Sequence, residues 1–92
     1  MDAIAVLAEP VRRRILDELR PADRTVGDLV AALGMSQPAV SKHLKVLREA
    51  GYVSSRTAAQ HRIYRLEREP FRALERWLAP YSNLWAARGR RA

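Results

Sequence analysis

Polar and cationic side chains follow one side of a helix that we expect within residues 35 to 53, "MSQPAVSKHLKVLREAGYV". Val40, Leu44 and Leu47 recur at helical spacing, so we expect these three to be buried. The other side carries amide, hydroxyl, ammonium and guanidinium groups, which are the groups that bind the phosphates and base edges of nucleic acids. The residues of this polar side are Gln37, Ser41, Lys42, Lys45 and Arg48.

Four of these side chains differ in the contact that each is expected to make. Gln37 can bind a base edge or a phosphate, and Ser41 is small enough to let the helix approach a groove closely. Lys42 and Lys45 are expected to contact phosphates, because a flexible point charge fixes register poorly. The alternative for Gln37 and Ser41 is an ordinary solvated surface residue, and the alternative for the two lysines is a base contact.

Three further residues of the same segment each have a structural role and are also candidates for contact with DNA. Ser36 is a good N-cap, and the free N–H groups at such a helix start favour a phosphate nearby. Pro38 is expected to set the first turn, and it could also contact a thymine methyl group. His43 lies three residues after Val40, at the edge of the buried face, where packing is favoured; it stays among the candidate DNA-binding residues.

The helix that comes before this one completes a helix-turn-helix over about residues 25 to 50. Thr25 and Asp28 have the spacing of a capping box, and Gly34 fits the left-handed residue that ends a helix. Apolar residues at i, i+3, i+4 and i+7 give this helix one buried face. In DNA-binding versions of the motif the second helix enters the major groove. The apolar residues are Val26, Leu29, Val30 and Leu33.

Residues 52 to 67, "YVSSRTAAQHRIYRLE", change to an alternation with a period of two, which predicts a β-hairpin. The loop near Ala59 and Gln60 contains no Gly or Asn, so the turn type stays open. A basic hairpin after such a helix pair is typical of a wing that reaches phosphates or the minor groove. A solvated hairpin surface is the alternative. The candidate DNA-binding residues of the hairpin are Arg56, His61 and Arg62, with Arg65 beside them.

The two ends of the chain are expected to form helices over about residues 2 to 8 and 70 to 88, with Pro80 kinking or dividing the second. Apolar residues in the second helix alternate in steps of three and four, the spacing of a helix-packing seam. An isologous two-fold interface would bury this surface. Packing within one chain is the alternative, and the place of Trp77 and Leu84 stays open. The expected dimer-interface residues are Ile4, Leu7, Phe71, Leu74, Leu78, Tyr81 and Trp85.

The composition fits one small folded domain with a polyanionic partner. The sequence has 92 residues, of which 48% are hydrophobic, and its net charge is +7. Basic side chains neutralise phosphates and release counterions, so this charge suits nucleic acid, although composition alone leaves membrane surfaces and acidic proteins open. The absence of cysteine from the sequence excludes disulfides and thiolate metal sites.

Other classes of protein fit the sequence poorly. No apolar run reaches the ~20 residues of a membrane span. An acidic residue precedes the first apolar stretch, which is the reverse of a secretory signal, so we expect a cytoplasmic protein without a membrane partner. We also expect no enzyme, because the sequence shows no Ser-His-Asp or Cys-His set and no glycine-rich phosphate loop.

Three segments resemble the ArsR (ArsR/SmtB) family of winged helix-turn-helix transcriptional regulators. They are "LAEPVRRRILDELR", "TVGDLVAALGMSQPAVSKHLKVLREAGYV" and "HRIYRL", and the C-terminal "WLAPYSNLW" resembles a cysteine-free branch of the family. The resemblance implies a mainly α-helical winged helix-turn-helix with a small β-hairpin, in the order helices, hairpin, helix. It also implies a homodimer built from the terminal helices, which binds a near-palindromic operator in double-stranded DNA, usually as a repressor of its own or a neighbouring operon.

The metal-sensing members of that family place their ligands where this sequence has none. Their thiolate site corresponds to "TVGDLVAAL", which lacks Cys, and their other common site uses Asp and His on the last helix, whereas residues 70 to 88 contain neither. His43 and His61 lie in separate elements without ligand spacing. We therefore expect no metal and no cofactor. The signal stays open between a small organic effector, another protein and protein concentration alone.

A rival function is a winged-helix interaction module whose basic face binds an acidic protein instead of DNA. The polar start of the helix within residues 35 to 53 and the arginines of the hairpin favour DNA, because both segments would then contact one duplex.

Overall fold

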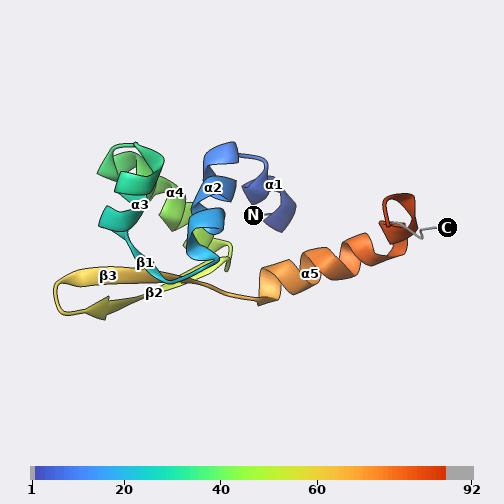
Figure 1. Ribbon diagram of the computed structural model, residues 1–92. Helices are drawn as coiled ribbons and strands as arrows, with labels where there is room; N and C mark the ends of the chain where they lie inside the picture. Colours follow the sequence, from blue (N-terminus) through green and yellow to red (C-terminus); the bar gives the residue numbers. More distant parts are fainter. Residues whose placement is uncertain (1, 87–92) are drawn as a thin grey trace.

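Short helices and a small antiparallel sheet form the body of the molecule, and one helix leaves this body as an arm (Figure 1). The computed structural model describes residues 2–86. The elements in chain order are α1 (Ala3–Leu7), α2 (Pro10–Leu19), β1 (Arg24–Thr25), α3 (Val26–Leu33), α4 (Gln37–Glu49), β2 (Val53–Ala58), β3 (His61–Leu66), α5 (Glu69–Leu78) and the 3-10 helix η1 (Ala79–Leu84). The predicted fold class, mainly helical with a small hairpin, is confirmed.

The core lies between α2, α3, α4 and the sheet, because each of these elements turns one apolar face toward the others. The apolar stripe predicted on α4 is fully buried, since Val40, Leu44 and Leu47 are each 0% exposed. Burial of one such side chain is worth about 1.5–3 kcal/mol. The polar side of α4 is therefore held outward by the packing of the opposite side. The other core residues are Val6, Ile15, Leu16, Leu19, Leu29, Leu33, Tyr52, Val53 and Tyr64.

The ends of α3 and α4 form as the local sequence predicts. The Asp28 N–H donates to Thr25 Oγ1 at 3.0 Å, and the Thr25 N–H donates to Asp28 Oδ2 at 3.0 Å, which completes the capping box. Gly34 ends α3 in the left-handed region at φ 66°. Ser36 then caps α4, because its Oγ accepts the Ala39 N–H at 3.3 Å. These ends fix the short turn of the helix-turn-helix.

The sheet contains a third strand that the sequence pattern did not predict. The strand order is β1-β3-β2, and all pairs are antiparallel. Strand β1 pairs Arg24 with Tyr64 and Thr25 with Ile63. Two residues are too few to show a period-two pattern, and their partner strand lies far along the chain. The β1–β3 pairing places the start of α3 beside the hairpin.

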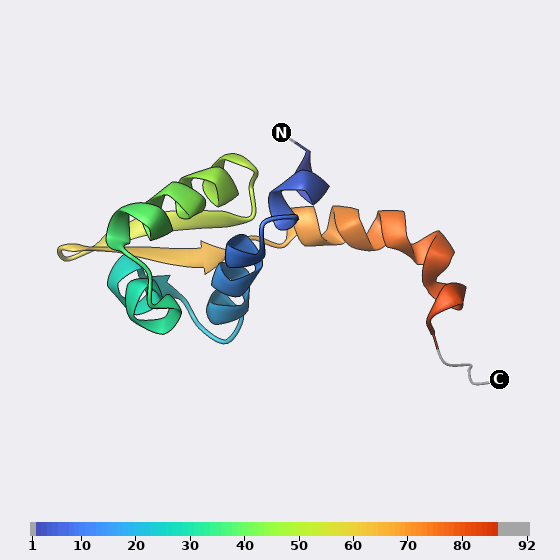
Figure 2. The same cartoon turned by 90° about the horizontal axis from the view of Figure 1, so that it is seen from above.

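The hairpin closes through a tight turn at Ala59 and Gln60. The register runs from Val53 opposite Leu66 to Ala58 opposite His61, which leaves two residues in the turn. Ala59 has a φ of 56°, a region that residues other than glycine adopt rarely. The tip of the hairpin and the 3-10 helix η1 lie at opposite ends of the molecule (Figures 1 and 2).

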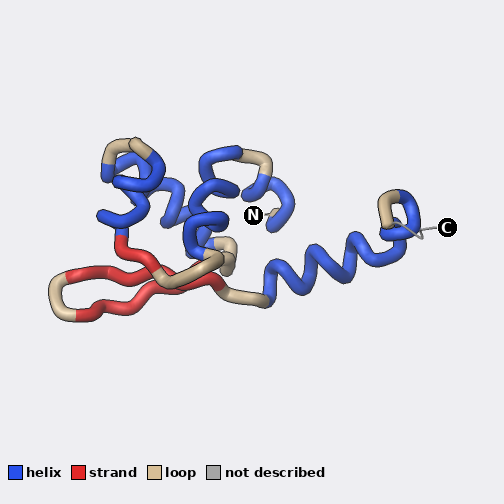
Figure 3. Tube along the Cα trace, in the orientation of Figure 1, coloured by secondary structure: helices blue, strands red, loops and turns tan. Residues whose placement is uncertain are grey.

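The C-terminal segment divides near Pro80, as predicted. Helix α5 ends at Leu78, and the chain continues as η1. Proline lacks the N–H that an α-helix needs at this place, so the helical ladder cannot continue unchanged. Figure 3 shows α5 as one helix that leaves the end of β3 and extends away from the other helices. Residues 87 and 88 of the predicted last helix lie outside the described residues.

Tyr52 ties the arm and the N-terminal helix to the body. Its ring is fully buried and meets Phe71 of α5 edge-on, with ring centroids 5.2 Å apart and an interplanar angle of 77°. Its hydroxyl group donates to the Ala3 carbonyl oxygen of α1 at 2.8 Å. Burial raises the pKa of Tyr52 above its ordinary value. The phenol therefore stays protonated at neutral pH and can keep this hydrogen bond.

Candidate nucleic-acid interface

Helix α4 presents the predicted polar residues to solvent. Gln37, Lys42 and Lys45 are exposed, and Ser41 is partly exposed. Since the opposite side of α4 is held by the core, these side chains form one accessible face. Gln37 is the first residue of α4, so its amide lies at the helix end that carries free N–H groups.

A hollow of about 380 Å³ joins this face of α4 to the hairpin and to the start of α3. It brings Gln37 and Ser41 of α4 together with His61 and Arg62 of β3, four of the residues predicted from the sequence. The β1–β3 pairing is the reason, because it holds the start of α3 against β3 next to α4. The complete lining is Thr25, Val26, Gly27, Gln37, Ser41, Gln60, His61, Arg62 and Tyr64.

The hollow also includes residues that the sequence analysis missed. Thr25 and Gly27 come from the start of α3, and Gln60 comes from the hairpin turn. Gln60 is exposed and has an amide that can donate and accept hydrogen bonds. Gln60 directly precedes the candidate residues His61 and Arg62 in the sequence, and this position could have marked it as a further candidate. No local signal marks Thr25 or Gly27, because their position depends on the pairing of β1.

Arg56 lies apart from this hollow and has an intramolecular partner. Its Nη1 donates to Asp23 Oδ2 at 3.0 Å, and the two side chains are 54% and 43% exposed. Exposed ion pairs of this kind contribute about 0–1 kcal/mol. A phosphate would therefore compete with Asp23 for the guanidinium group at small cost.

Pro38 and His43 differ in their exposure. Pro38 is exposed in the first turn of α4, whereas His43 is partly buried. His43 Nδ1 is buried and has no hydrogen-bond partner among residues 2–86. This placement agrees with the expected position of His43 at the edge of the buried face.

The capping box adds a fixed negative charge near the hairpin cations. The Thr25 N–H and hydroxyl group, followed by the charges of Arg24 and His61, lower the pKa of Asp28 below its ordinary value. The carboxylate therefore stays ionised at neutral pH and keeps its bonds to Thr25. Its main effect is to hold the start of α3 in place beside the hollow.

The residues predicted for a dimer interface fall into two groups. Leu7, Phe71 and Leu74 are partly buried and pack against the core of their own chain. The others are exposed, with exposed fractions of 47% for Ile4, 40% for Leu78, 46% for Tyr81 and 60% for Trp85. Two further residues share this exposure, namely Trp77 at 56% and Leu84 at 76%.

All of these exposed side chains except Ile4 lie on the arm, which comprises α5, η1 and Trp85. Soluble monomers rarely expose large contiguous apolar patches, so such a surface is typical of an interaction site. Trp77 also packs against Tyr81, with ring centroids 5.3 Å apart. The sequence left open whether Trp77 and Leu84 belong to the core. Both are exposed on the arm and lie outside the core of their own chain.

Two other kinds of feature are absent from the part of the chain that the structure describes. Within residues 2–86, no group of three His, Cys, Asp or Glu side chains is arranged to hold a metal ion. In the same range, no helix combines the length and apolar character that crossing a bilayer requires.

The chain is similar in sequence to known bacterial regulatory proteins. Residues 9–55 match the model of the bacterial regulatory protein, arsR family. The HTH-type transcriptional repressor SmtB of Mycobacterium tuberculosis is 43% identical over 65 residues, which cover 71% of this chain and 48% of SmtB. The chain thus spans about half the length of that relative. The transcriptional repressor SdpR of Bacillus subtilis is 31% identical over 77 residues, which cover 84% of this chain and 86% of SdpR.

Solved structures agree with the sequence comparison. The crystal structure of an ArsR family transcriptional regulator, RHA00566, has a TM-score of 0.78 at 32% identity and covers 98% of this chain and 90% of its own. The homodimeric winged helix-turn-helix DNA-binding domain of Mb0332 from Mycobacterium bovis has a TM-score of 0.71 at 30% identity and covers 85% of this chain and 75% of its own. These are similarities in both sequence and fold, and they confirm the family that the three sequence segments resemble. The chain belongs to the ArsR family of bacterial regulatory proteins.

Proposed function

We propose that the chain is a sequence-specific transcriptional repressor, which binds a near-palindromic operator in double-stranded DNA as a homodimer. The observation that carries the proposal is the hollow shared by α4 and the hairpin, because Gln37, Ser41, His61 and Arg62 approach it from two elements. A helix in the major groove and a wing on the adjacent backbone would use these two elements together. Repressors of the same family, SmtB and SdpR, support this direction of regulation.

In this proposal the residues of the interface have different roles. The amide of Gln37 reads a base edge, while Lys42 and Lys45 bind phosphates on either side of the groove. Arg56 exchanges its bond to Asp23 for a phosphate, and the hairpin cations bind the neighbouring backbone. The remaining contact candidates, Ser36, Pro38 and His43, line the start and one edge of α4.

The arm supplies the two-fold contact in this proposal. The homodimeric domain of Mb0332 supports it, as do the exposed apolar side chains of α1, α5 and η1. Burial of these side chains between two copies removes apolar surface from water, which stabilises the dimer. Such a dimer presents α4 twice, and it acts in the cytoplasm, where a bacterial operator lies.

Lys42→Ala tests the phosphate role of this side chain. We expect weaker binding to every duplex, because the lost contact is electrostatic, and a slope of log affinity against log salt that is smaller by about 1 for each bound protomer, hence by about 2 for the homodimer. Binding titrations at several salt concentrations measure that slope. Arg76→Ala removes a cation from the arm and serves as the control, with an unchanged slope. A wild-type slope for Lys42→Ala would exclude Lys42 from the phosphate contacts.

Trp85→Ala tests the arm as the dimer contact. The side chain is 60% exposed in the single chain, so its loss should leave folding intact and shift the dimer toward monomer. Sedimentation velocity at several protein concentrations measures the shift. Lys45→Ala is the control, because Lys45 lies on the polar face of α4 and not on the arm, and this variant should sediment as the wild type does. An unmoved profile for Trp85→Ala would place the interface elsewhere.

Selection of bound sequences from a random duplex pool tests the function as a whole. The expected product is an inverted repeat whose half-site centres lie about 34 Å apart, one helical turn, or a multiple of it. A single half-site would contradict the dimer geometry. No enrichment at all would contradict DNA recognition and favour a module that binds an acidic protein.

A further inference from the structure

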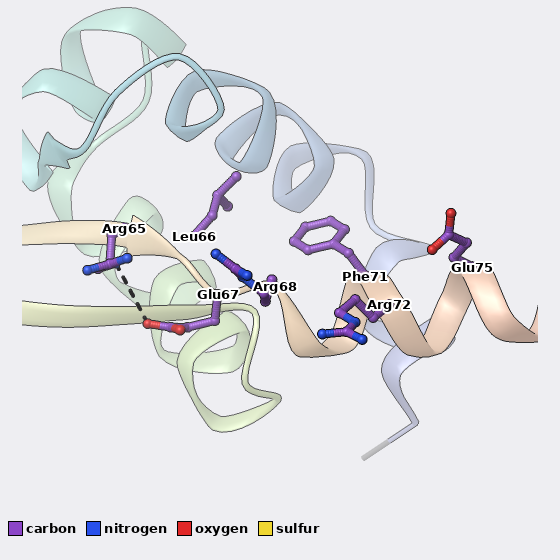
Figure 4. A pocket seen from close by; sticks show the side chains of 7 residues that line it. All are labelled: Arg65, Leu66, Glu67, Arg68, Phe71, Arg72 and Glu75. Carbon is purple, nitrogen blue, oxygen red and sulfur yellow. Dashed lines mark ion pairs between the residues drawn. The ribbon is translucent and has the colours of Figure 1, made fainter.

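A second cavity lies where the hairpin meets the arm, away from the interface proposed for DNA. Its volume is about 580 Å³, and it opens between the end of β3 and the first turns of α5 (Figure 4). Small-molecule sites in proteins commonly have volumes of about 300–1,000 Å³. The residues that line it are Arg65, Leu66, Glu67, Arg68, Phe71, Arg72 and Glu75.

Two of the charges in this cavity lie within ion-pair distance of each other. Arg65 Nε lies 3.9 Å from Glu67 Oε2. The same carboxylate also accepts a hydrogen bond from the Ser54 hydroxyl group. Both contacts use Oε2 of Glu67, and neither Arg68 nor Arg72 forms an ion pair with this carboxylate among residues 2–86.

Arg68 and Arg72 remain as cations without a partner among residues 2–86. They stand one helical turn apart, since the Arg72 N–H donates to the Arg68 carbonyl oxygen at 3.0 Å. In Figure 4 the Arg68 guanidinium group lies toward the end of β3, the Arg72 guanidinium group lies beside the first turns of α5 below Phe71, and the Glu75 carboxylate lies beyond Phe71. Two guanidinium groups on neighbouring turns can bind a single carboxylate through charge-assisted hydrogen bonds.

The floor of the cavity beside these cations is apolar. Leu66 and Phe71 are partly buried, and Phe71 packs its ring against Tyr52, which fixes the orientation of the ring. Figure 4 shows both side chains between the strand and the arm, next to Arg68. An apolar body could pack here while an acidic group reaches the arginines, which is the usual division of a small-molecule site.

We propose that this cavity binds a small organic acid, with one carboxylate held by Arg68 and Arg72 and an apolar body packed on Leu66 and Phe71. The position of the site gives it a regulatory role, which rests on the proposed function. Its walls come from β3, a strand of the hairpin, and from α5, the helix of the dimer arm. A ligand that prefers one angle between these elements would change operator affinity, and operator would change ligand affinity by the same factor.

Binding is tested first without DNA, so that its failure and the failure of DNA recognition can be told apart. The probes are indole-3-acetate and decanoate, which distinguish an aromatic from an aliphatic body, and the controls are their uncharged amides. Two-dimensional NMR of the full chain reports the site directly. The expected result is that at least one acid shifts the backbone N–H signals of residues 65 to 69, 71 and 72, and that the uncharged amide of this acid binds at least tenfold more weakly.

The double variant Arg68→Gln/Arg72→Gln should weaken binding of that acid at least tenfold. Both side chains are exposed, so the variant should keep the wild-type spectrum elsewhere. Arg76→Gln is the matched control, because Arg76 lies on the same helix, is paired with Glu69 at 3.3 Å and does not line the cavity. It should bind the probe as the wild type does.

Several results would overturn the proposal. The proposal is wrong if neither acid shifts these signals at millimolar concentration, if acid and amide bind equally, or if the double variant binds the acid as the wild type does. If no probe binds and the double variant instead dissociates in sedimentation, the cavity is a contact between two copies. Equal operator affinity with and without saturating probe would overturn the regulatory role alone.

Discussion

Leu44→Ala should lower the free energy of unfolding by about 2–5 kcal/mol, the range for a fully buried leucine that leaves a cavity behind. Leu44 is 0% exposed and belongs to the stripe that holds α4 against the core. Because so small a domain has little stability in reserve, this loss should leave part of the protein unfolded at 37 °C. Urea unfolding followed by circular dichroism, at one fixed protein concentration, measures the change.

Lys45→Ala is the matched control for this prediction, since it lies next to Leu44 on the exposed side of α4. It should change stability by less than about 0.5 kcal/mol, as surface substitutions usually do. The two variants then separate the two sides of one helix. A cost below about 1 kcal/mol for Leu44→Ala would mean that the core closes over the gap, contrary to close packing.

Gln37→Ala should relax discrimination at one base position of the operator half-site by roughly 1–3 kcal/mol, the worth of a good bidentate contact between an amide and a base. Gln37 is exposed at the start of α4 and lines the hollow beside the hairpin. Competition titrations with operators changed at single positions measure the effect. The loss should appear at one position and be absent elsewhere.

Gln60→Ala is the matched control, because it removes a side-chain amide of the same kind from the hairpin side of the same hollow. It should leave the base preference at the Gln37 position unchanged. Equal losses on operator and random duplex after Gln37→Ala would make Gln37 a backbone contact, which positions the protein without reading sequence.

The ends of the helices could be predicted from the sequence because their determinants are local. The capping box of Thr25 and Asp28, the left-handed Gly34 and the N-cap Ser36 each act within one turn of the chain. The buried stripe of α4 is equally local, since helical spacing alone brings its members to one side. Once the buried side of α4 is known, the residues of the other side are predicted to be exposed.

Features that join distant segments could not be predicted in the same way. Strand β1 is two residues long and depends on β3, so no pattern within Arg24–Thr25 signals it. The pairing of Arg56 with Asp23 joins the hairpin to the loop between α2 and β1. The cavity at the start of α5 depends on the direction in which that helix leaves the sheet. The sequence therefore indicated which side chains of α4 and the hairpin to consider, but not the hollow that brings them together.

The left-handed Ala59 has a consequence for the way the hairpin would meet a duplex. Holding an alanine there costs roughly 1–2 kcal/mol relative to a relaxed residue. Its methyl group also narrows the range of shapes open to the unbound loop, which a glycine would widen. The pairing of β2 with β3 leaves only Ala59 and Gln60 to close the loop, so this pairing offsets the cost and holds the tip in the shape that would meet a duplex.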